Sequence, residues 1–172
     1  MSMNISKELN QAAARKNVTQ LSIARQTHRA HTTISGYFNS EDTPLPAMQE
    51  LASVLDDSIF SHQMSHKTFG TLPAMESEVF QDTPHALDML SEMEAAERKA
   101  RKNEALMVLC KQDNYLTDQD KTILSVYANE FLDEMLIETK LVMSILEKTN
   151  TSFMQAITDR VPYWIQKNYL GK

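Results

Sequence analysis

Residues 19–38 read TQLSIARQTHRAHTTISGYF, a run in which two short apolar patterns stand on either side of a polar connection. Thr19 is a favourable N-cap for a helix over residues 20–26, because its hydroxyl can accept a hydrogen bond from a first-turn N–H. A second short helix is predicted over about residues 32–39, with Ile34 buried. The sequence therefore predicts two short helices joined by a tight turn.

Helices are also predicted on both sides of this pair. Ile5, Leu9 and Ala12 recur at helical spacing before it, and the proline-containing segment 43–46 opens a helix after it, whose apolar stripe ends at Leu55. No stretch alternates apolar and polar residues with a period of two, so strands are not expected. The predicted fold class is all-α.

Several spaced matches in this region resemble the lambda-repressor-like (Xre-type) helix-turn-helix family. They are the TQ pair at 19–20, the IA pair at 23–24, the TIS triplet at 33–35 and the segment ELASVL at 50–55. In that family the alanine of the IA pair lies where two helices cross closely. The resemblance covers about residues 4–58, and the remaining two thirds of the chain show no comparably specific match.

The resemblance implies that the helix over residues 20–26 braces the motif and that the helix beginning near His31 enters the major groove of double-stranded DNA. By position, His31 and Thr32 are the expected base contacts. Neither side chain makes a bidentate contact with a base, so recognition is expected to depend on half-site spacing and DNA shape. The residues placed for phosphate contacts are Gln20, Arg29, Thr33, Ser35 and Asn39.

Five positions depart from the family pattern. Thr27 and Arg29 stand where the family usually has apolar residues, and Ala30 stands where it usually has a capping Ser or Thr, so a distorted turn is expected. Glu41 and Asp42 follow the second helix, in a segment that usually runs along the phosphate backbone and favours basic residues. These two acids oppose DNA binding by Coulomb repulsion.

Charge is unevenly distributed along the chain. The net charge of −6 over 172 residues argues against a general nucleic-acid coat. Residues 1–40, however, carry five basic residues against one acid, so any DNA contact is expected there. If all five bind phosphates, the logarithmic salt dependence of binding has a slope no steeper than about −4.5 per bound subunit.

The composition excludes several classes of protein. Three isolated glycines rule out a glycine-rich phosphate loop, and the single cysteine, Cys110, rules out an internal disulfide and a multi-cysteine metal centre. No apolar run approaches the roughly 18 residues of a membrane span, so a cytoplasmic protein without a membrane partner is expected. His62 and His66 have the spacing of a metal pair but lack a third ligand, and no nucleophile–base pair is recognisable. We expect no enzyme activity and no cofactor.

The rest of the chain is predicted to contain a linker over residues 61–83, with one short helical piece near 75–80, and then a long helix from residue 84 to about 110. Apolar and small residues repeat along that helix at alternating spacings of three and four, which is a heptad seam. The seam residues assigned to dimerisation are Met89, Met93, Ala96, Ala100, Asn103 and Met107.

Two further helices are predicted after a capping-box pattern at 117–120 and a second one at 152–155, over about residues 118–148 and 153–160. The first has an apolar face wide enough to be buried on more than one side. Asn103 in the preceding seam has two interpretations, a polar pair that sets the register between two chains or a residue facing water.

These patterns predict a helix-turn-helix domain at residues 1–60, a linker at 61–83 and a helical dimerisation and effector region at 84–172. The expected function is transcription regulation by a bacterial or phage repressor that binds an operator as a homodimer. The alternative is a protein-binding module, similar to an antirepressor or antitoxin, whose helices bind another regulatory protein. A small-molecule sensor in the C-terminal helices is a third interpretation.

Overall fold

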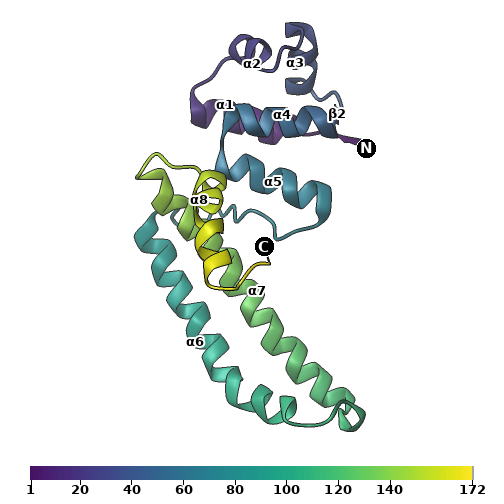
Figure 1. Ribbon diagram of the computed structural model, residues 1–172, viewed down its shortest axis with the longest axis vertical. Helices are drawn as coiled ribbons and strands as arrows, with labels where there is room; N and C mark the ends of the chain where they lie inside the picture. Colours follow the sequence, from purple (N-terminus) through teal and green to yellow (C-terminus); the bar gives the residue numbers. More distant parts are fainter. Residues whose placement is uncertain (172) are drawn as a thin grey trace. The chain divides into compact units, whose positions relative to one another are not determined.

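The computed structural model describes residues 1–171, which form eight α-helices, one short 3-10 helix and a two-stranded sheet (Figure 1). The all-α class predicted from the sequence is confirmed at this level. Strands β1 (Ser2–Met3) and β2 (Thr43–Pro44) pair antiparallel, with Met3 opposite Thr43. Two-residue strands are too short to show an alternating pattern, which is why the sequence does not indicate them.

The described residues divide into two compact units, and each is described by itself. The first unit is Met1–Ala74 together with the segment that begins at Asn150, and the second is Met75–Thr149. The sequence interpretation groups residues 84–172 together, whereas the structure separates the last helix from that group. The backbone N–H of Phe153, at the start of that helix, donates to Ser58 Oγ of the first unit at 2.9 Å.

In the first unit, α1 packs against α3, α4 and α5, and α2 packs against α3 and α4. A single apolar core lies between them, and its burial is the main stabilising contribution. The helices are α1 (Ser6–Lys16), α2 (Gln20–Gln26), α3 (His31–Phe38), α4 (Leu45–Leu55), α5 (Ser58–Phe69) and α8 (Phe153–Gln166). The largest fully buried core side chains are Ile5, Leu9, Ile23, Ile34, Met48, Leu51 and Phe60.

Helix α5 corrects the predicted linker over residues 61–83, because it occupies the first part of that segment. Asp57 caps the helix by accepting a hydrogen bond from the Phe60 N–H at 2.7 Å, and the helix ends at Gly70 in the left-handed conformation, with φ of 65°. Buried apolar side chains hold it against α1 and α4. The helical piece expected near residues 75–80 is not present.

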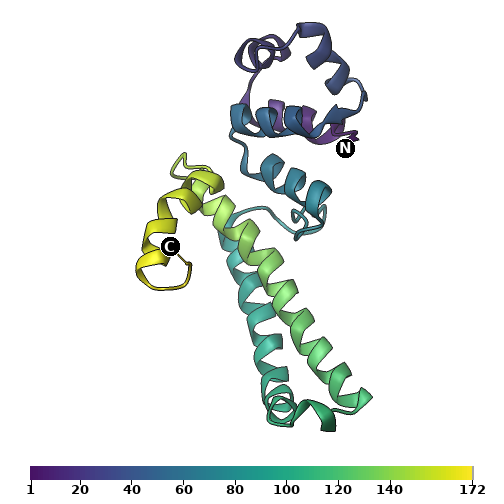
Figure 2. The same cartoon turned by 45° about the vertical axis from the view of Figure 1, so that its right-hand side comes forward.

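The second unit is a hairpin in which α6 and α7 run antiparallel and lie side by side along their length (Figures 1 and 2). Its elements are α6 (Pro84–Leu109), the 3-10 helix η1 (Asp113–Tyr115) and α7 (Asp118–Glu147). The predicted capping box at the start of α7 is confirmed: Thr117 Oγ1 accepts from the Asp120 N–H at 3.2 Å, and the Asp120 carboxylate accepts from the Thr117 N–H at 2.9 Å.

Ion pairs join α6 and its C-terminal end to α7. Arg98 forms a bidentate hydrogen bond with Glu134, and Lys111 Nζ donates to Asp120 Oδ1 at 2.7 Å. The hydrogen bond from Lys111 and those from Thr117 lower the pKa of Asp120 to about 2. The face of α6 that contacts α7 is therefore the one that carries Arg98 and the residues three and four positions from it.

The helix predicted to end near residue 160 continues through Pro162 to Gln166. An interior proline removes one backbone donor and crowds the carbonyl group four residues earlier, so it disfavours a helix at this point, but α8 contains Pro162 and continues past it. Within residues 1–171, no helix combines the length and the apolar character needed to cross a bilayer.

Candidate nucleic-acid interface

The α2–turn–α3 segment is stabilised by an N-cap at the start of α2 and by buried apolar side chains of both helices. Thr19 Oγ1 accepts from the Ser22 N–H at 3.2 Å and caps α2. Ile23 and Ile34 have no exposed surface, and Ala24 is 4% exposed. A larger side chain at Ala24 would enter this packed core and displace its neighbours.

The turn between α2 and α3 accommodates the departures from the family pattern. Thr27 is buried, and its hydroxyl donates to the Ile23 carbonyl oxygen at 2.8 Å, so a polar residue is satisfied inside the core. His28 takes the left-handed conformation with φ of 53°, which lets the chain reverse direction. Ala30 precedes α3 in extended conformation and offers no side-chain cap.

The outward face of α3 carries most of the residues predicted to meet DNA. His31 and Thr32 are exposed, as is Asn39, whose side-chain amide donates to Ser35 Oγ at 3.3 Å. Thr32, Ser35 and Asn39 are spaced by three and four residues, so they share one helical face. Gln20 and Ser35 are half-buried, and so is Thr33.

Arg29 is the predicted phosphate contact that the structure places differently. Its Nε donates to Oε2 of Glu50 on α4 at 2.8 Å, and its side chain is 27% exposed. The hydrogen bond that Arg29 donates to Glu50 is the main cause that raises the pKa of Arg29 above its ordinary value. The spacing of residues in the sequence does not reveal this pairing, because Glu50 lies 21 residues from Arg29 and on helix α4.

Two other cations of the N-terminal segment also bind acceptors of the same chain. Arg15 makes a bidentate ion pair with Asp57, at 2.9 Å and 2.8 Å, and Lys16 Nζ donates to the Asp56 carbonyl oxygen at 2.9 Å. Of the five cations counted from the sequence, three therefore bind an acceptor of the same chain. Lys7 and Arg25 have no such acceptor among residues 1–171. The expected limit on phosphate contacts falls accordingly.

Glu41 is the residue of this region whose position the sequence does not reveal. Gly36 follows Thr32 by one turn on the outward face of α3, yet Gly36 is buried. A Cβ added to Gly36 would clash with the Glu41 carboxylate, whose farther oxygen would lie 2.9 Å away. The carboxylate of Glu41 therefore lies directly on the face of α3 that is expected to meet DNA.

The residues assigned to dimerisation lie on α6 away from the contacts with α7. All six are exposed, and Met89, Met93 and Met107 are exposed by 56%, 59% and 73%. On α7, the apolar face expected to be buried leaves Phe131 and Leu132 39% and 51% exposed, respectively. The second unit thus presents apolar surface on both helices.

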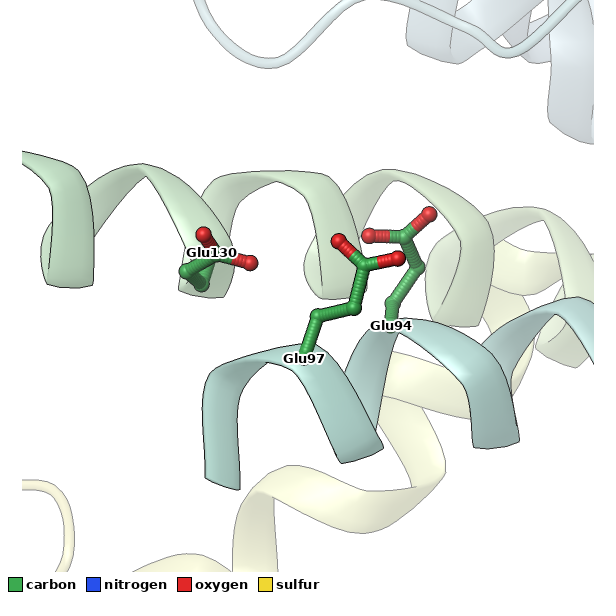
Figure 3. A group of neighbouring side chains, drawn as sticks. All are labelled: Glu94, Glu97 and Glu130. Atoms are coloured by element: carbon green, nitrogen blue, oxygen red, sulfur yellow. The ribbon is translucent and has the colours of Figure 1, made fainter. Parts of the chain in front are cut away.

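A cluster of carboxylates lies between α6 and α7: Glu94 and Glu97 come from α6 and Glu130 from α7 (Figure 3). Their nearest oxygens all lie within 4.8 Å of one another. Partial burial and the neighbouring carboxylates raise the pKa of Glu94. Arg101 lies 3.8 Å from Glu130 and offsets part of this negative charge.

Comparisons with known proteins return no match: neither a protein-family model, nor a curated protein, nor a solved structure is significantly similar to this chain.

Proposed function

We propose that this protein binds double-stranded DNA through α3 and regulates transcription as a dimeric repressor of the lambda-repressor-like helix-turn-helix class. The observation that carries the proposal is the exposure of His31 and Thr32 at the start of α3, while the opposite face of α3 is anchored in the core by Ile34. A short helix held in this way can enter a major groove without unfolding its scaffold.

The expected binding mode follows from the side chains on that face. Thr32 can contact a thymine methyl group or exchange a hydrogen bond with a base edge, and His31 can donate or accept. Ser35, which is half-buried, and Asn39, which is exposed, are the expected phosphate contacts on this face. Since no bidentate base contact is available from these residues, affinity for one half-site is expected to be modest.

Dimerisation supplies the affinity that one domain lacks. The exposed seam on α6, with Met89, Met93 and Met107, supports pairing with a second copy, because monomers rarely leave such a row of large apolar side chains in water. Once one α3 is bound, the second is held near the other half-site at a high effective concentration. An occupied operator then excludes polymerase sterically, in the cytoplasm where we expect the protein to act.

The direct test is fluorescence anisotropy with a labelled duplex from the region upstream of the gene, measured at several salt concentrations. With two available cations, we expect a logarithmic salt slope of about −1.8 per bound subunit, shallower than the limit from sequence. His31→Ala and Thr32→Ala should weaken binding to the specific duplex more than to a random duplex. Lys16→Ala is the control, because Lys16 binds the Asp56 carbonyl oxygen and should contribute little.

The alternative function, a protein-binding module without DNA affinity, is favoured by the carboxylate of Glu41 on α3 and by the pairing of Arg29 with Glu50. Both reduce the positive potential where phosphates would approach. The same titration separates the two functions. Absence of binding to the upstream duplex and to random duplexes, at micromolar protein and low salt, would exclude the repressor.

A further inference from the structure

The chain after α3 turns back so that Glu41 reaches Gly36. The Gly36 carbonyl oxygen accepts hydrogen bonds from the N–H groups of Asn39 at 2.9 Å and Glu41 at 3.0 Å. Ser40 takes a left-handed conformation with φ of 80°, and its carbonyl oxygen accepts from the Asn4 side chain at 2.9 Å. The backbone on both sides of the reversal is thus fixed within reach of α3, and the Glu41 carboxylate lies against Gly36.

Gly36 makes this arrangement possible. Any side chain at Gly36 would point outward one turn beyond Thr32 and would occupy the space that the Glu41 carboxylate fills. The glycine removes that side chain from α3, and Glu41 supplies a carboxylate in its place. Glu41 itself is exposed, and within residues 1–171 its carboxylate has no hydrogen-bond or ion-pair partner.

An ionised carboxylate only accepts hydrogen bonds. In the major groove, the donors are the amino groups at N4 of cytosine and N6 of adenine, whereas guanine and the thymine carbonyl present acceptors. A carboxylate that enters the groove beside an acceptor is left unpaired and repelled, and this penalty discriminates between bases.

We infer that Glu41 is a specificity-determining residue that reads the amino group of a cytosine, or less favourably of an adenine, one turn along α3 from Thr32. This inference rests on the proposed function, because it requires α3 to enter the major groove. The acidic residue after α3 then contributes to specificity. Its carboxylate lowers affinity for most sequences but not for those that present an amino group at one position.

Selection of bound duplexes from a randomised library tests the inference, with the full chain and four variants. The wild-type protein should enrich cytosine at one position of each half-site by about fivefold over guanine or thymine, the lower end of the range for a specific base contact. Glu41→Ala should abolish that preference. Glu41→Gln should shift it toward adenine, because glutamine can pair with adenine N6 and N7.

Two further variants test whether the position of the Glu41 carboxylate or negative charge alone sets the base preference. Gly36→Ala should abolish the preference as Glu41→Ala does, because the new methyl group displaces the flexible carboxylate while alanine favours the helix. Asp42→Asn removes the same charge from the neighbouring exposed residue and should keep the preference. Circular dichroism verifies that each variant remains folded.

The possible outcomes are distinct. Identical base preferences for the wild-type protein and Glu41→Ala would overturn the role of Glu41 and leave the proposed function standing. Failure of the wild-type protein to enrich any sequence would overturn the proposed function, and the inference with it.

Discussion

Arg29 donates through Nε to Oε2 of Glu50 at 2.8 Å, and this ion pair joins the turn before α3 to helix α4. The pair holds the cation nearest to the start of α3 against the protein and raises its pKa. Glu50 is 47% exposed, so the pair adds little to folding stability. Its main effect is expected on DNA binding, because Glu50 competes with phosphate for Arg29.

Glu50→Ala should release Arg29 and strengthen DNA binding. One additional phosphate contact makes the logarithmic salt slope more negative by about 0.9 per subunit. Fluorescence anisotropy between 50 mM and 200 mM salt measures both the affinity for DNA and its salt slope. Phosphate contacts make the affinity depend strongly on salt over this range. Gln49→Ala, on the neighbouring exposed position of α4, is the control and should change neither. An unchanged slope in Glu50→Ala would show that Arg29 does not reach phosphate.

The seam on α6 should pair two chains. We expect sedimentation at tens of micromolar protein to give twice the monomer mass of 19.6 kDa, and Met93→Glu to give the monomer, because an ionised carboxylate cannot be buried in an apolar interface without a partner. Leu109→Glu is a closely matched control: Leu109 is 58% exposed and Met93 59%, but Leu109 lies off the seam. A wild-type protein that sediments only as monomer would contradict dimerisation.

How much of the fold can be predicted depends on how local its signals are. The helices that begin at residues 20, 118 and 153 could be predicted because each start is marked by a capping side chain directly before it. Helix α5 has the same signals, Asp57 before it and Gly70 after it, but polar residues interrupt its apolar pattern. Periodicity alone therefore failed to indicate it.

The candidate site is predictable only in part for a related reason. The helical position of Thr32 follows from spacing along one helix, whereas the contact of Glu41 with Gly36 depends on the left-handed conformation of Ser40. The pairing of Arg29 with Glu50 depends on how the turn between α2 and α3 lies against α4. Tertiary contacts of this kind leave no trace in the spacing of residue types.

The Asp57 side chain should contribute more to the free energy of unfolding than the acidic partners in the other ion pairs of the first unit. It caps α5 and accepts two hydrogen bonds from Arg15, and it is 6% exposed, whereas Arg15 is 31% exposed. Asp57→Ala should lower the free energy of unfolding by about 2 kcal/mol, mostly from the lost cap because the partly exposed pair contributes under about 1 kcal/mol. Urea denaturation followed by circular dichroism measures this change.

Asp57→Asn separates the two roles, since asparagine caps a helix as well as aspartate but carries no charge. We expect it to recover most of the stability lost in Asp57→Ala. Equal losses in the two variants would instead assign the stabilisation to the ion pair with Arg15.

The carboxylate cluster should make the hairpin of α6 and α7 less stable at neutral pH. Partial burial is the first cause that raises the pKa of Glu94, and the carboxylates around it add to this effect. A raised pKa in the folded state means that ionisation costs folding energy. The penalty is present at neutral pH and is relieved as the pH falls through the raised pKa of the folded state. The acidic neighbours that contribute are Glu97, Asp133, Glu130 and Glu134.

Glu94→Gln should therefore stabilise the hairpin at pH 7, by roughly 0.5 kcal/mol if the effect is that of a like-charge pair one turn apart on a helix. The gain should disappear at about pH 3, more than one unit below the ordinary pKa of a glutamate, where the wild-type carboxyl group is protonated in both states. Urea denaturation at the two pH values measures the difference. Glu104→Gln is the control, because Glu104 is exposed and its charged neighbour one turn away is Arg101, so removing its charge relieves no repulsion. A stabilisation by Glu94→Gln that is equal at both pH values would mean that glutamine packs better at this position, and that charge repulsion is not the cause.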